Sequence, residues 1–487
     1  MSEITFRSAG ALAQAIRQRT VSSRELLEHY LARVDRLNPA LNAVVTIDAE
    51  GARAAADAAD AALARRDTLG PLHGVPMTIK DAFETTAVRS TCGFHEWADH
   101  HPVEDAEAVA RLRAAGVIIF GKTNVPVLAG DWQSYNPIFG VTNNPWDVTR
   151  TPGGSSGGAA AALAADLTPL ELGSDIGGSI RVPSSWTGIC GHKPSYGLVP
   201  SRGHLPPGPG SLAEPDLNVV GPLARCVDDL MRELDILAGP LPDRATAWTL
   251  RLPPPRRTAL GDLRLACWFD DAAFPVDDSV RTVLEDMAGV LRRAGARIDD
   301  RARPAFALAD AVRTFQQLLL PVVIGGFPRP QFDAFAGMAA GLSDDDDSPL
   351  ARTARYGTMR HRDWMLTHEA REQLRARFAE FFTSFDALLC PVMVVPAIPH
   401  DHSEPFPART ITVNGQTRPY TDLFGWVGMA TAAYLPATVV PVGRTASGLP
   451  VGVQIIGPYL EDRTPLAVAT HIESLLGGFA IPPGYGS

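Results

Sequence analysis

The sequence predicts an α/β protein in which strands and helices alternate along most of the chain. Short β-branched and apolar runs of strand length recur between longer stretches whose apolar residues have helical spacing. With 487 residues, the chain can bury a large core in one α/β unit or in two or three domains. Such alternation is typical of helices that cover the faces of a central sheet.

The N-terminal part of the chain predicts helices. Two are expected within residues 8–37, and the second begins with a capping box in which Ser22 and Glu25 are three positions apart. Asn38 and Pro39 are expected to end that helix. A further alanine-rich helix is expected over residues 49–64.

The next stretch introduces a lysine in an unusual place. Residues 72–81 predict a short strand that ends at Lys80, and burying an ammonium group there would be costly. A helix over residues 106–115 and a strand over residues 117–120 follow. Residues 116–123 also match the phosphate-binding pattern GxxxxGK[ST], but their middle residues form the predicted strand itself. We therefore disfavour nucleotide binding.

The stretch Thr151–Pro194 contains two glycine-flanked serine sites. These are Gly153–Gly158 and Gly177–Ser179, and either one alone would be interpreted as a turn. Glycines this dense let the backbone adopt positive φ and approach a bound group closely. Residues 175–179 could thus point several N–H groups at one spot, as an oxyanion hole requires. A helix over residues 159–165 is expected between the two sites.

The remaining residues predict more strands and helices. A proline-rich stretch at residues 252–257 is interpreted as an exposed connector. Strands are expected over residues 219–223, 263–268, 387–391, 438–442 and 451–456, and helices over residues 228–237, 279–294, 363–385 and 465–475.

Composition excludes several classes of function. The formal net charge of −10 argues against nucleic acid or an anionic membrane as a partner. No apolar run resembles a signal peptide or a membrane span, so a cytoplasmic location is expected. No cluster of His, Cys and Asp has metal-ligand spacing, and neither a metal nor another cofactor is expected.

Cysteine usage favours reduced thiols. The five cysteines are scattered, and no CxxC pair occurs. Cys190 lies nearest to the serine sites, but its surroundings indicate a packed strand end. It is therefore expected to be a small buried hydrophobe and not a nucleophile.

Lys80, Ser155, Ser179 and the glycine backbone could together hydrolyse an amide. A serine hydroxyl is a poor nucleophile at neutral pH and needs a base. A lysine whose pKa is lowered by burial can serve in place of a histidine. The tetrahedral oxyanion needs preorganised donors, which the glycine-rich backbone could supply.

Six motifs occur in a fixed order along the chain, and together they resemble the amidase signature family. The resemblance covers most of residues 70–225 and returns over residues 435–459. The motifs are Gly74–Asp81, Gly121–Asn124, Pro152–Gly158, Gly173–Pro183, Gly188–Pro194 and Gly448–Gln454.

The resemblance implies roles for individual residues. Ser179 would be the nucleophile, Ser155 the bridging serine after a cis Gly154–Ser155 bond, and Lys80 the base. The other implied roles are oxyanion-hole donors at Ile176, Gly177, Gly178 and Ser179, substrate contacts at Ala129, Gly130, Asp131 and Ser155, and supporting positions at Ser156, Asp175 and Arg181. Ser174 and Ser195 replace residues that are often Thr in the family, and both keep a hydroxyl.

The family fold would be a mixed, twisted central β-sheet between helical layers, in a single catalytic domain over residues 1–487. Its parts would be a helical layer (1–65), the catalytic core (66–240), a variable segment that forms part of the substrate pocket (241–430), and C-terminal core strands with a helix (431–487). Aromatic candidates in the variable segment are Phe315, Tyr356, Trp364, Phe424 and Trp426.

The resemblance implies an amidohydrolase that acts on linear C–N bonds other than peptide bonds, through an acyl-Ser179 intermediate. Aryl esters and carbamates are expected to react as well, because the same acyl-serine chemistry serves them. The expected partner is a small-molecule amide, ester or carbamate, with no nucleic acid and no membrane. A homodimer is compatible with the sequence.

Two further functions remain open. Gly153–Gly157 also fits the GxSxG nucleophile elbow, which would make Ser155 the nucleophile of a Ser-His-Asp esterase, with His361, His400 or His471 as base. Alternatively, the chain could be the glutaminase subunit of a tRNA-dependent amidotransferase, which shares the family core. The segment Ser201–Pro207 is more similar to stand-alone amidases.

Overall fold

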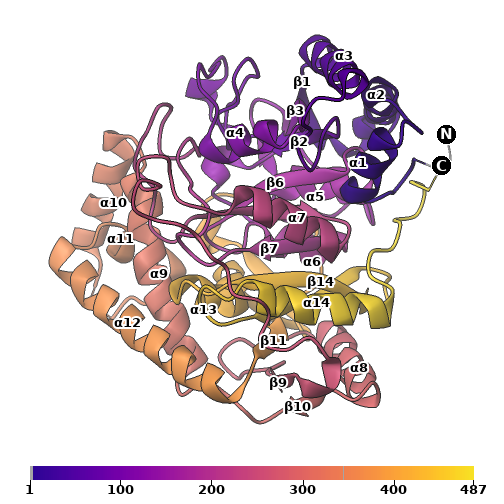
Figure 1. Ribbon diagram of the computed structural model, residues 1–487. Helices are drawn as coiled ribbons and strands as arrows, with labels where there is room; N and C mark the ends of the chain where they lie inside the picture. Colours follow the sequence, from indigo (N-terminus) through magenta and orange to yellow (C-terminus); the bar gives the residue numbers. More distant parts are fainter. Residues whose placement is uncertain (1–3, 344, 487) are drawn as a thin grey trace.

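The computed structural model describes residues 4–343 and 345–486, and a mixed sheet of eleven strands lies at its centre (Figure 1). The strand order across the sheet is β1 (Val44–Ile47), β3 (Ile118–Thr123), β2 (Pro76–Lys80), β6 (Leu170–Asp175), β8 (Val219–Ala224), β7 (Cys190–Lys193), β14 (Ala437–Arg444), β15 (Pro450–Ile456), β11 (Ala387–Pro391), β9 (Arg264–Cys267) and β10 (Arg297–Asp299). The pairs β3–β2, β2–β6, β11–β9 and β9–β10 are parallel. The other neighbours are antiparallel.

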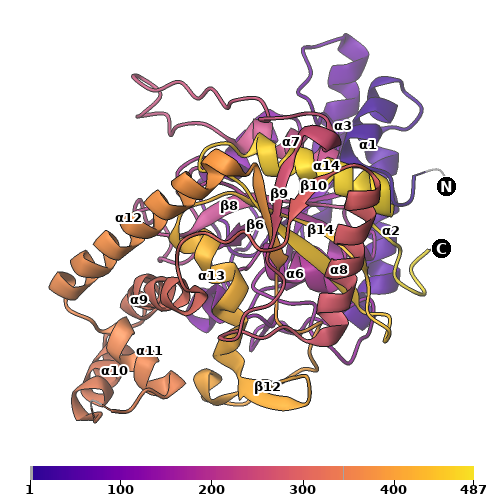
Figure 2. The same cartoon turned by 90° about the horizontal axis from the view of Figure 1, so that it is seen from below.

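Helices cover both faces of this sheet. On one face α7 (Val227–Leu237) packs beside α14 (Arg463–Leu476), and on the other α5 (Gly157–Ala164) packs beside α6 (Arg181–Thr187) (Figures 1 and 2). Every residue of β2, β6 and β8 is buried, because the central strands have a helical layer above and below. The predicted sheet between helical layers is confirmed.

The N-terminal helices are α1 (Ala9–Arg17), α2 (Ser23–Leu41) and α3 (Ala49–Arg65). The predicted capping box of Ser22 and Glu25 is present. The predicted end of α2 at Asn38-Pro39 is wrong, since the helix continues to Leu41. Proline removes only one N–H in this last turn. The Asn38 side chain instead accepts hydrogen bonds from the N–H groups of Ala43 and Val44, just beyond the helix.

Most predicted elements beyond the N-terminal helices are present, together with helices and hairpins that the sequence did not indicate. α4 (Glu107–Ala114), α8 (Asp278–Arg293) and α12 (His361–Ser384) were expected. Those not predicted are α9 (Leu308–Gly325), α10 (Arg329–Gly341), α11 (Pro349–Gly357), α13 (Phe424–Ala432) and two hairpins, β4 (Tyr135–Asn136) with β5 (Gly140–Val141) and β12 (Thr410–Val413) with β13 (Gln416–Pro419). Figure 2 shows α10 and α11 projecting away from the sheet.

No helix in the described ranges is both long enough and apolar enough to cross a membrane. The five cysteines are free thiols.

Candidate active site

Lys80 lies where the carboxyl ends of two neighbouring parallel strands, β2 and β6, meet. It is the last residue of β2, and β2 pairs with β6 so that Ile79 is opposite Leu172. Lys80 therefore meets the end of β6, where its Nζ is 2.9 Å from Ser174 Oγ and 2.8 Å from Ser155 Oγ. Its side chain is completely buried.

Burial lowers the pKa of the Lys80 amine. Desolvation lowers the pKa of Lys80 to about 7, against the weaker opposing effects of Cys92, Asp175 and Glu171. Its closest polar partners are hydroxyl groups and not carboxylates. A substantial fraction of the amine is therefore neutral at neutral pH, as proton abstraction requires.

Ser155 lies in the glycine-rich turn that leads into α5. The Gly154–Ser155 peptide bond is cis, as the resemblance implied. A Cβ atom at Gly154 would lie 2.5 Å from the Asp131 carbonyl oxygen, so a larger residue does not fit there. The next residue, Ser156, donates its N–H to the Ser179 carbonyl at 3.1 Å. This bond holds the two glycine–serine sites against each other.

The loop that carries Ser179 is organised around Asp175 at the end of β6. Its carboxylate accepts hydrogen bonds from the N–H groups of Gly178 at 2.9 Å and Ile180 at 3.1 Å, and from the Arg181 guanidinium at 2.9 Å. Both charged side chains have an exposed fraction of 0%. Burial raises the pKa of Asp175, but the charge and hydrogen bonds of Arg181, together with the charge of Lys193 and the Gly178 N–H, outweigh it and lower the pKa to about 2.

Arg181 fixes this loop to the C-terminal part of the chain. Its Nη1 donates to the Val427 carbonyl at 2.9 Å and to Gln454 Oε1 at 2.5 Å, and its Nη2 donates to Thr431 Oγ1 at 2.7 Å. These partners belong to α13 and β15. Residues distant in sequence thus hold the Ser179 loop in one conformation.

Three of the four expected oxyanion-hole donors are available. Within the described part of the chain, the N–H groups of Ile176, Gly177 and Ser179 have no hydrogen-bond acceptor. The expectation for Gly178 differs, because its N–H donates to Asp175 Oδ1. The Gly177 carbonyl accepts from Trp132 Nε1 at 2.8 Å, which fixes the orientation of that peptide. The three remaining donors can meet a developing oxyanion.

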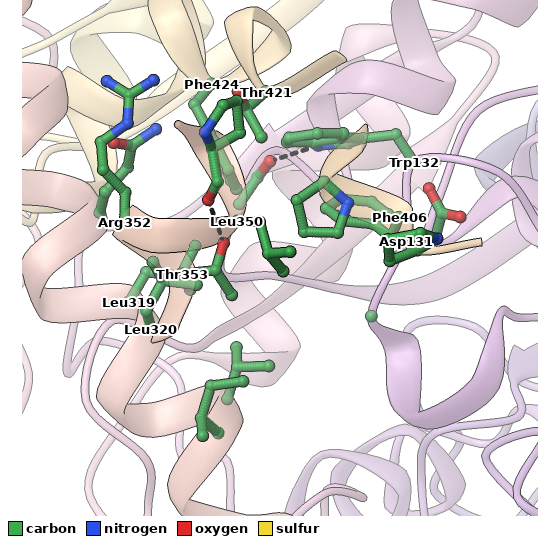
Figure 3. Close-up of a pocket in the computed structure, with 18 of the residues that line it drawn as sticks. Asp131, Trp132, Leu319, Leu320, Leu350, Arg352, Thr353, Phe406, Thr421 and Phe424 are labelled. Carbon is green, nitrogen blue, oxygen red and sulfur yellow. Dashed lines mark hydrogen bonds between the residues drawn. The ribbon is translucent and has the colours of Figure 1, made fainter. Parts of the chain in front are cut away.

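Two cavities meet at Ser179. The first has a volume of about 320 Å³ and is lined mainly by apolar side chains from α9, α11 and the segments around Trp132 and Phe406 (Figure 3). The second, of about 610 Å³, also reaches Ser155, Ser174 and His204. Apolar residues of the first cavity are Trp132, Leu319, Leu320, Val323, Ile324, Phe327, Phe335, Leu350, Phe406 and Phe424.

The expected substrate-contact residues Ala129, Gly130 and Asp131 line both cavities. Asp131 is already neutralised, since its carboxylate accepts from Arg409 Nη1 at 2.6 Å and from the Tyr420 hydroxyl at 2.8 Å. The Ser179 hydroxyl, in contrast, has no hydrogen-bond partner in residues 4–343 and 345–486. It is free to approach a substrate carbonyl.

Of the five aromatic candidates, Phe424 lines the first cavity. Phe315 packs behind it, with ring centroids 5.5 Å apart. Trp426 packs against Trp268 in the core, and Trp364 stacks between His361 and His368. Tyr356 lines a separate cavity of about 180 Å³.

The structure does not support the esterase alternative. His471 contacts the Thr258 carbonyl, His361 stacks on Trp364, and His400 lies beside His402. Among the residues that the structure describes, no histidine is hydrogen-bonded to Ser155 or Ser179.

The phosphate-loop pattern is part of a strand. β3 extends through Lys122 and Thr123, so this segment is not a loop. The Lys122 ammonium is buried, and it donates to the Phe83 carbonyl at 2.5 Å and to Thr85 Oγ1 at 2.8 Å. No helix follows directly.

Cys190 is buried in β7, where desolvation raises the pKa of its thiol well above the usual value.

Sequence reasoning missed His204, and it placed part of the pocket in residues 241–430 without predicting the wall formed there by α9, α10 and α11. His204 Nε2 lies 2.7 Å from Ser174 Oγ, and Ser174 Oγ in turn contacts Lys80 Nζ. The segment Ser201–Pro207 was noted for its resemblance to stand-alone amidases, but its histidine was not. A histidine directly after a glycine and two residues before a Pro-Pro pair could have drawn attention to it.

The chain matches the Amidase family model over residues 25–466. A glutamyl-tRNA(Gln) amidotransferase subunit from Acidothermus cellulolyticus is 33% identical over 499 residues, covering 97% of this chain and 95% of that protein. Its counterpart from Roseiflexus sp. (strain RS-1) is 34% identical, covering 93% of each chain. A crystal structure of an amidase is 28% identical and superposes with a TM-score of 0.79, covering 97% of this chain and 100% of that one. The chain is therefore a member of the amidase signature family.

Proposed function

We propose that this protein hydrolyses carboxylic acid amides through an acyl-Ser179 intermediate. The observation that carries the proposal is the buried Lys80 amine, 2.8 Å from Ser155 Oγ, next to two cavities that both reach Ser179. Lys80 is the base, Ser155 the relay and Ser179 the nucleophile. The reaction is that of an amidohydrolase on linear C–N bonds other than peptide bonds.

The steps follow from these positions. Ser179 Oγ attacks the substrate carbonyl carbon while its proton passes to Ser155 Oγ and the Ser155 proton passes to Lys80. The oxyanion accepts hydrogen bonds from the N–H groups of Ile176, Gly177 and Ser179. Lys80 returns the proton through Ser155 to the leaving nitrogen, the C–N bond breaks, and the amine departs. Water then attacks the acyl-Ser179 ester, and the acid is released.

The first cavity supports an apolar substrate. Its charged side chains are already in ion pairs: Asp131 and Glu404 with Arg409, and Arg352 with Asp347 at 3.8 Å. A substrate with its own ammonium and carboxylate, such as glutamine, would have to compete with these existing pairs, and the largely apolar lining offers few other partners for its charges. Aryl or alkyl amides fit this lining, and aryl esters and carbamates would share the same acyl-serine chemistry.

A second candidate is the glutaminase subunit of a tRNA-dependent amidotransferase. The names of the sequence relatives favour it more strongly than they favour stand-alone hydrolysis. In that role, this chain would release ammonia from glutamine at Ser179 and would work in a complex. The same three catalytic residues would be used, so only the substrate and the partner distinguish the two candidates.

Purified chain, assayed alone, separates the candidates. We expect turnover of an aryl amide such as 4-nitroacetanilide and no ammonia release from glutamine. Glutamine turnover that depends on the other amidotransferase subunits being added, with no aryl amide turnover, would instead establish the second candidate.

Substitution then tests the assignment of roles. Ser179→Ala and Lys80→Ala should abolish turnover, whereas His361→Ala, His400→Ala and His471→Ala should each keep most of it. An inactive but folded variant of one of these histidines would overturn the proposed chemistry in favour of the esterase alternative.

A further inference from the structure

We propose that His204 is a positioning residue: its Nε2 accepts a hydrogen bond from the Ser174 hydroxyl and thereby leaves the Lys80 lone pair free for Ser155. The inference rests on the proposed function and adds a member to its proton relay. The hydrogen-bond donors and acceptors around Lys80 define this role.

The His204 ring has only one consistent tautomer. Its Nδ1 lies 3.1 Å from the Pro206 carbonyl oxygen, which can only accept, so Nδ1 carries the proton. Burial, and then the charge of Lys80, lower the pKa of His204 to about 3, so the ring is neutral at neutral pH. Nε2 of a neutral ring protonated at Nδ1 is an acceptor. The ring itself is fixed, edge-on to Phe83 with centroids 5.1 Å apart.

Ser174 must therefore donate to His204. Its Oγ lies 2.7 Å from His204 Nε2, and its single proton occupies that hydrogen bond. Toward Lys80, 2.9 Å away, Ser174 Oγ can then only accept. The Ser174 carbonyl, 3.5 Å from Lys80 Nζ, is also an acceptor. Ser174 thus offers two acceptors for the two N–H bonds of the neutral amine.

The lone pair of Lys80 remains for Ser155, whose Oγ is 2.8 Å away. Ser155 donates its proton to this lone pair, and its oxygen is then ready to receive the proton of Ser179. Without the His204 acceptor, the Ser174 hydroxyl can turn toward Lys80. Two hydroxyl groups would then compete for one lone pair, and the relay would be blocked for part of the time.

The other ionisable groups that act on Lys80 do not provide this acceptor. Cys92, Asp175 and Glu171 raise the pKa of Lys80 through their charge. The Asp175 carboxylate is occupied by Arg181 and backbone N–H groups, and Glu171 accepts from Thr78. In the described structure, Ser174 Oγ has hydrogen bonds only with Lys80 and His204.

The test compares His204→Leu, which removes both ring nitrogens, with His204→Gln, whose amide oxygen can accept in place of Nε2. We expect kcat for 4-nitroacetanilide to fall about 10- to 100-fold in His204→Leu, with KM within about twofold of wild type. The Gln variant should recover most of the rate. His73→Leu is a matched control, since His73 is also buried, at 7% exposure, but contacts the Ala59 carbonyl away from the site.

Two readouts separate positioning from a merely structural role. The acidic limb of the kcat/KM profile should move to lower pH in His204→Leu, because Ser174 then stabilises the neutral Lys80 amine. In a Ser174→Ala background, which lacks the competing hydroxyl, His204→Leu should cause no further loss. A folded His204→Leu variant with wild-type kcat, a Gln variant as slow as Leu, or additive losses would each overturn the inference.

Covalent labelling keeps this test independent of the substrate. The rate at which a fluorophosphonate modifies Ser179, followed by mass spectrometry, should fall in the order wild type, His204→Gln, His204→Leu. If wild type is labelled but hydrolyses no amide, the proposed substrate class fails and the labelling order still decides the role of His204. Equal labelling rates in all three proteins would contradict that role.

Discussion

The floor and the wall of the candidate site are built in opposite ways. The floor, formed by Lys80, Ser155 and residues 173–181, is buried, and its charged groups are held by several hydrogen bonds each. The wall, formed by α9, α10 and α11, presents apolar side chains to the first cavity (Figure 3), and α10 has no buried residue. Under the proposed function, the floor carries out the chemistry and the wall selects the substrate. Substitutions in the two regions should therefore differ in kind as well as in size.

The largest effect is expected in the floor at Lys80. Lys80→Met keeps much of the side-chain volume but removes the base, and kcat should fall about 1,000-fold or more. Single-turnover kinetics on protein with an unchanged circular dichroism spectrum provides the measurement. Lys122→Met is the matched control, because Lys122 is also buried but contacts Phe83 and Thr85 instead of the serines. Equal losses in the two variants would contradict the role of Lys80.

The ion pairs of the two regions should differ in their contribution to stability. Asp175→Asn leaves Arg181 buried without its countercharge, and the free energy of unfolding should fall by about 3–5 kcal/mol. Asp333→Asn in α10 breaks the exposed pair with Arg329, where the side chains are 85% and 54% exposed, and should not move the denaturant midpoint measurably. Urea unfolding of both variants checks this. Similar midpoints would mean that the floor is not held as described.

The pH dependence of the floor follows from Lys80. Because the pKa of Lys80 is lowered to about 7 and the base must be neutral, kcat/KM should rise as pH increases through about 7 and then level off. Two pH units below the midpoint, the loss should be about 100-fold. A profile that stays level from pH 5 to pH 8 would indicate another base.

The smallest effect is expected in the wall. Val323 of α9 is half-buried and lines both cavities. Val323→Ala removes two methyl groups from the lining, so kcat/KM for a bulky apolar amide should fall about tenfold, mainly through KM. A short acetyl amide, measured in parallel, should be nearly unaffected. A fall in kcat of the same size for both substrates would show that the wall affects the chemistry.

The residues of the floor could be predicted from the sequence, whereas for the wall the sequence indicated only the segment 241–430 and not its helices. Lys80 at the end of an apolar strand and the two glycine–serine turns are local patterns, and their order along the chain resembles one family. α13 is apolar on all sides and contains two glycines, so it has no periodic pattern to indicate a helix. α9 contains Pro321, which argues against a helix in sequence reasoning, yet the helix runs through it.

His204 was missed for another reason. It meets Ser174 because the segment around it forms a β-bridge with Phe83, more than a hundred residues earlier in the chain. No local spacing encodes such a contact. The expectation for Gly178 was wrong for a related reason. Its N–H points to Asp175 and not toward the oxyanion, and only the folded loop defines that direction.

The most direct test of the account is the identity of the acylated serine. The chain is mixed with an activated aryl carbamate, quenched and digested, and the carbamoylated peptide is sequenced by mass spectrometry. We expect the adduct on Ser179 in the wild-type protein, slower formation of the same adduct in Ser155→Ala, and none in Ser179→Ala. An adduct on Ser155 or Cys190, or one that persists in Ser179→Ala, would contradict it.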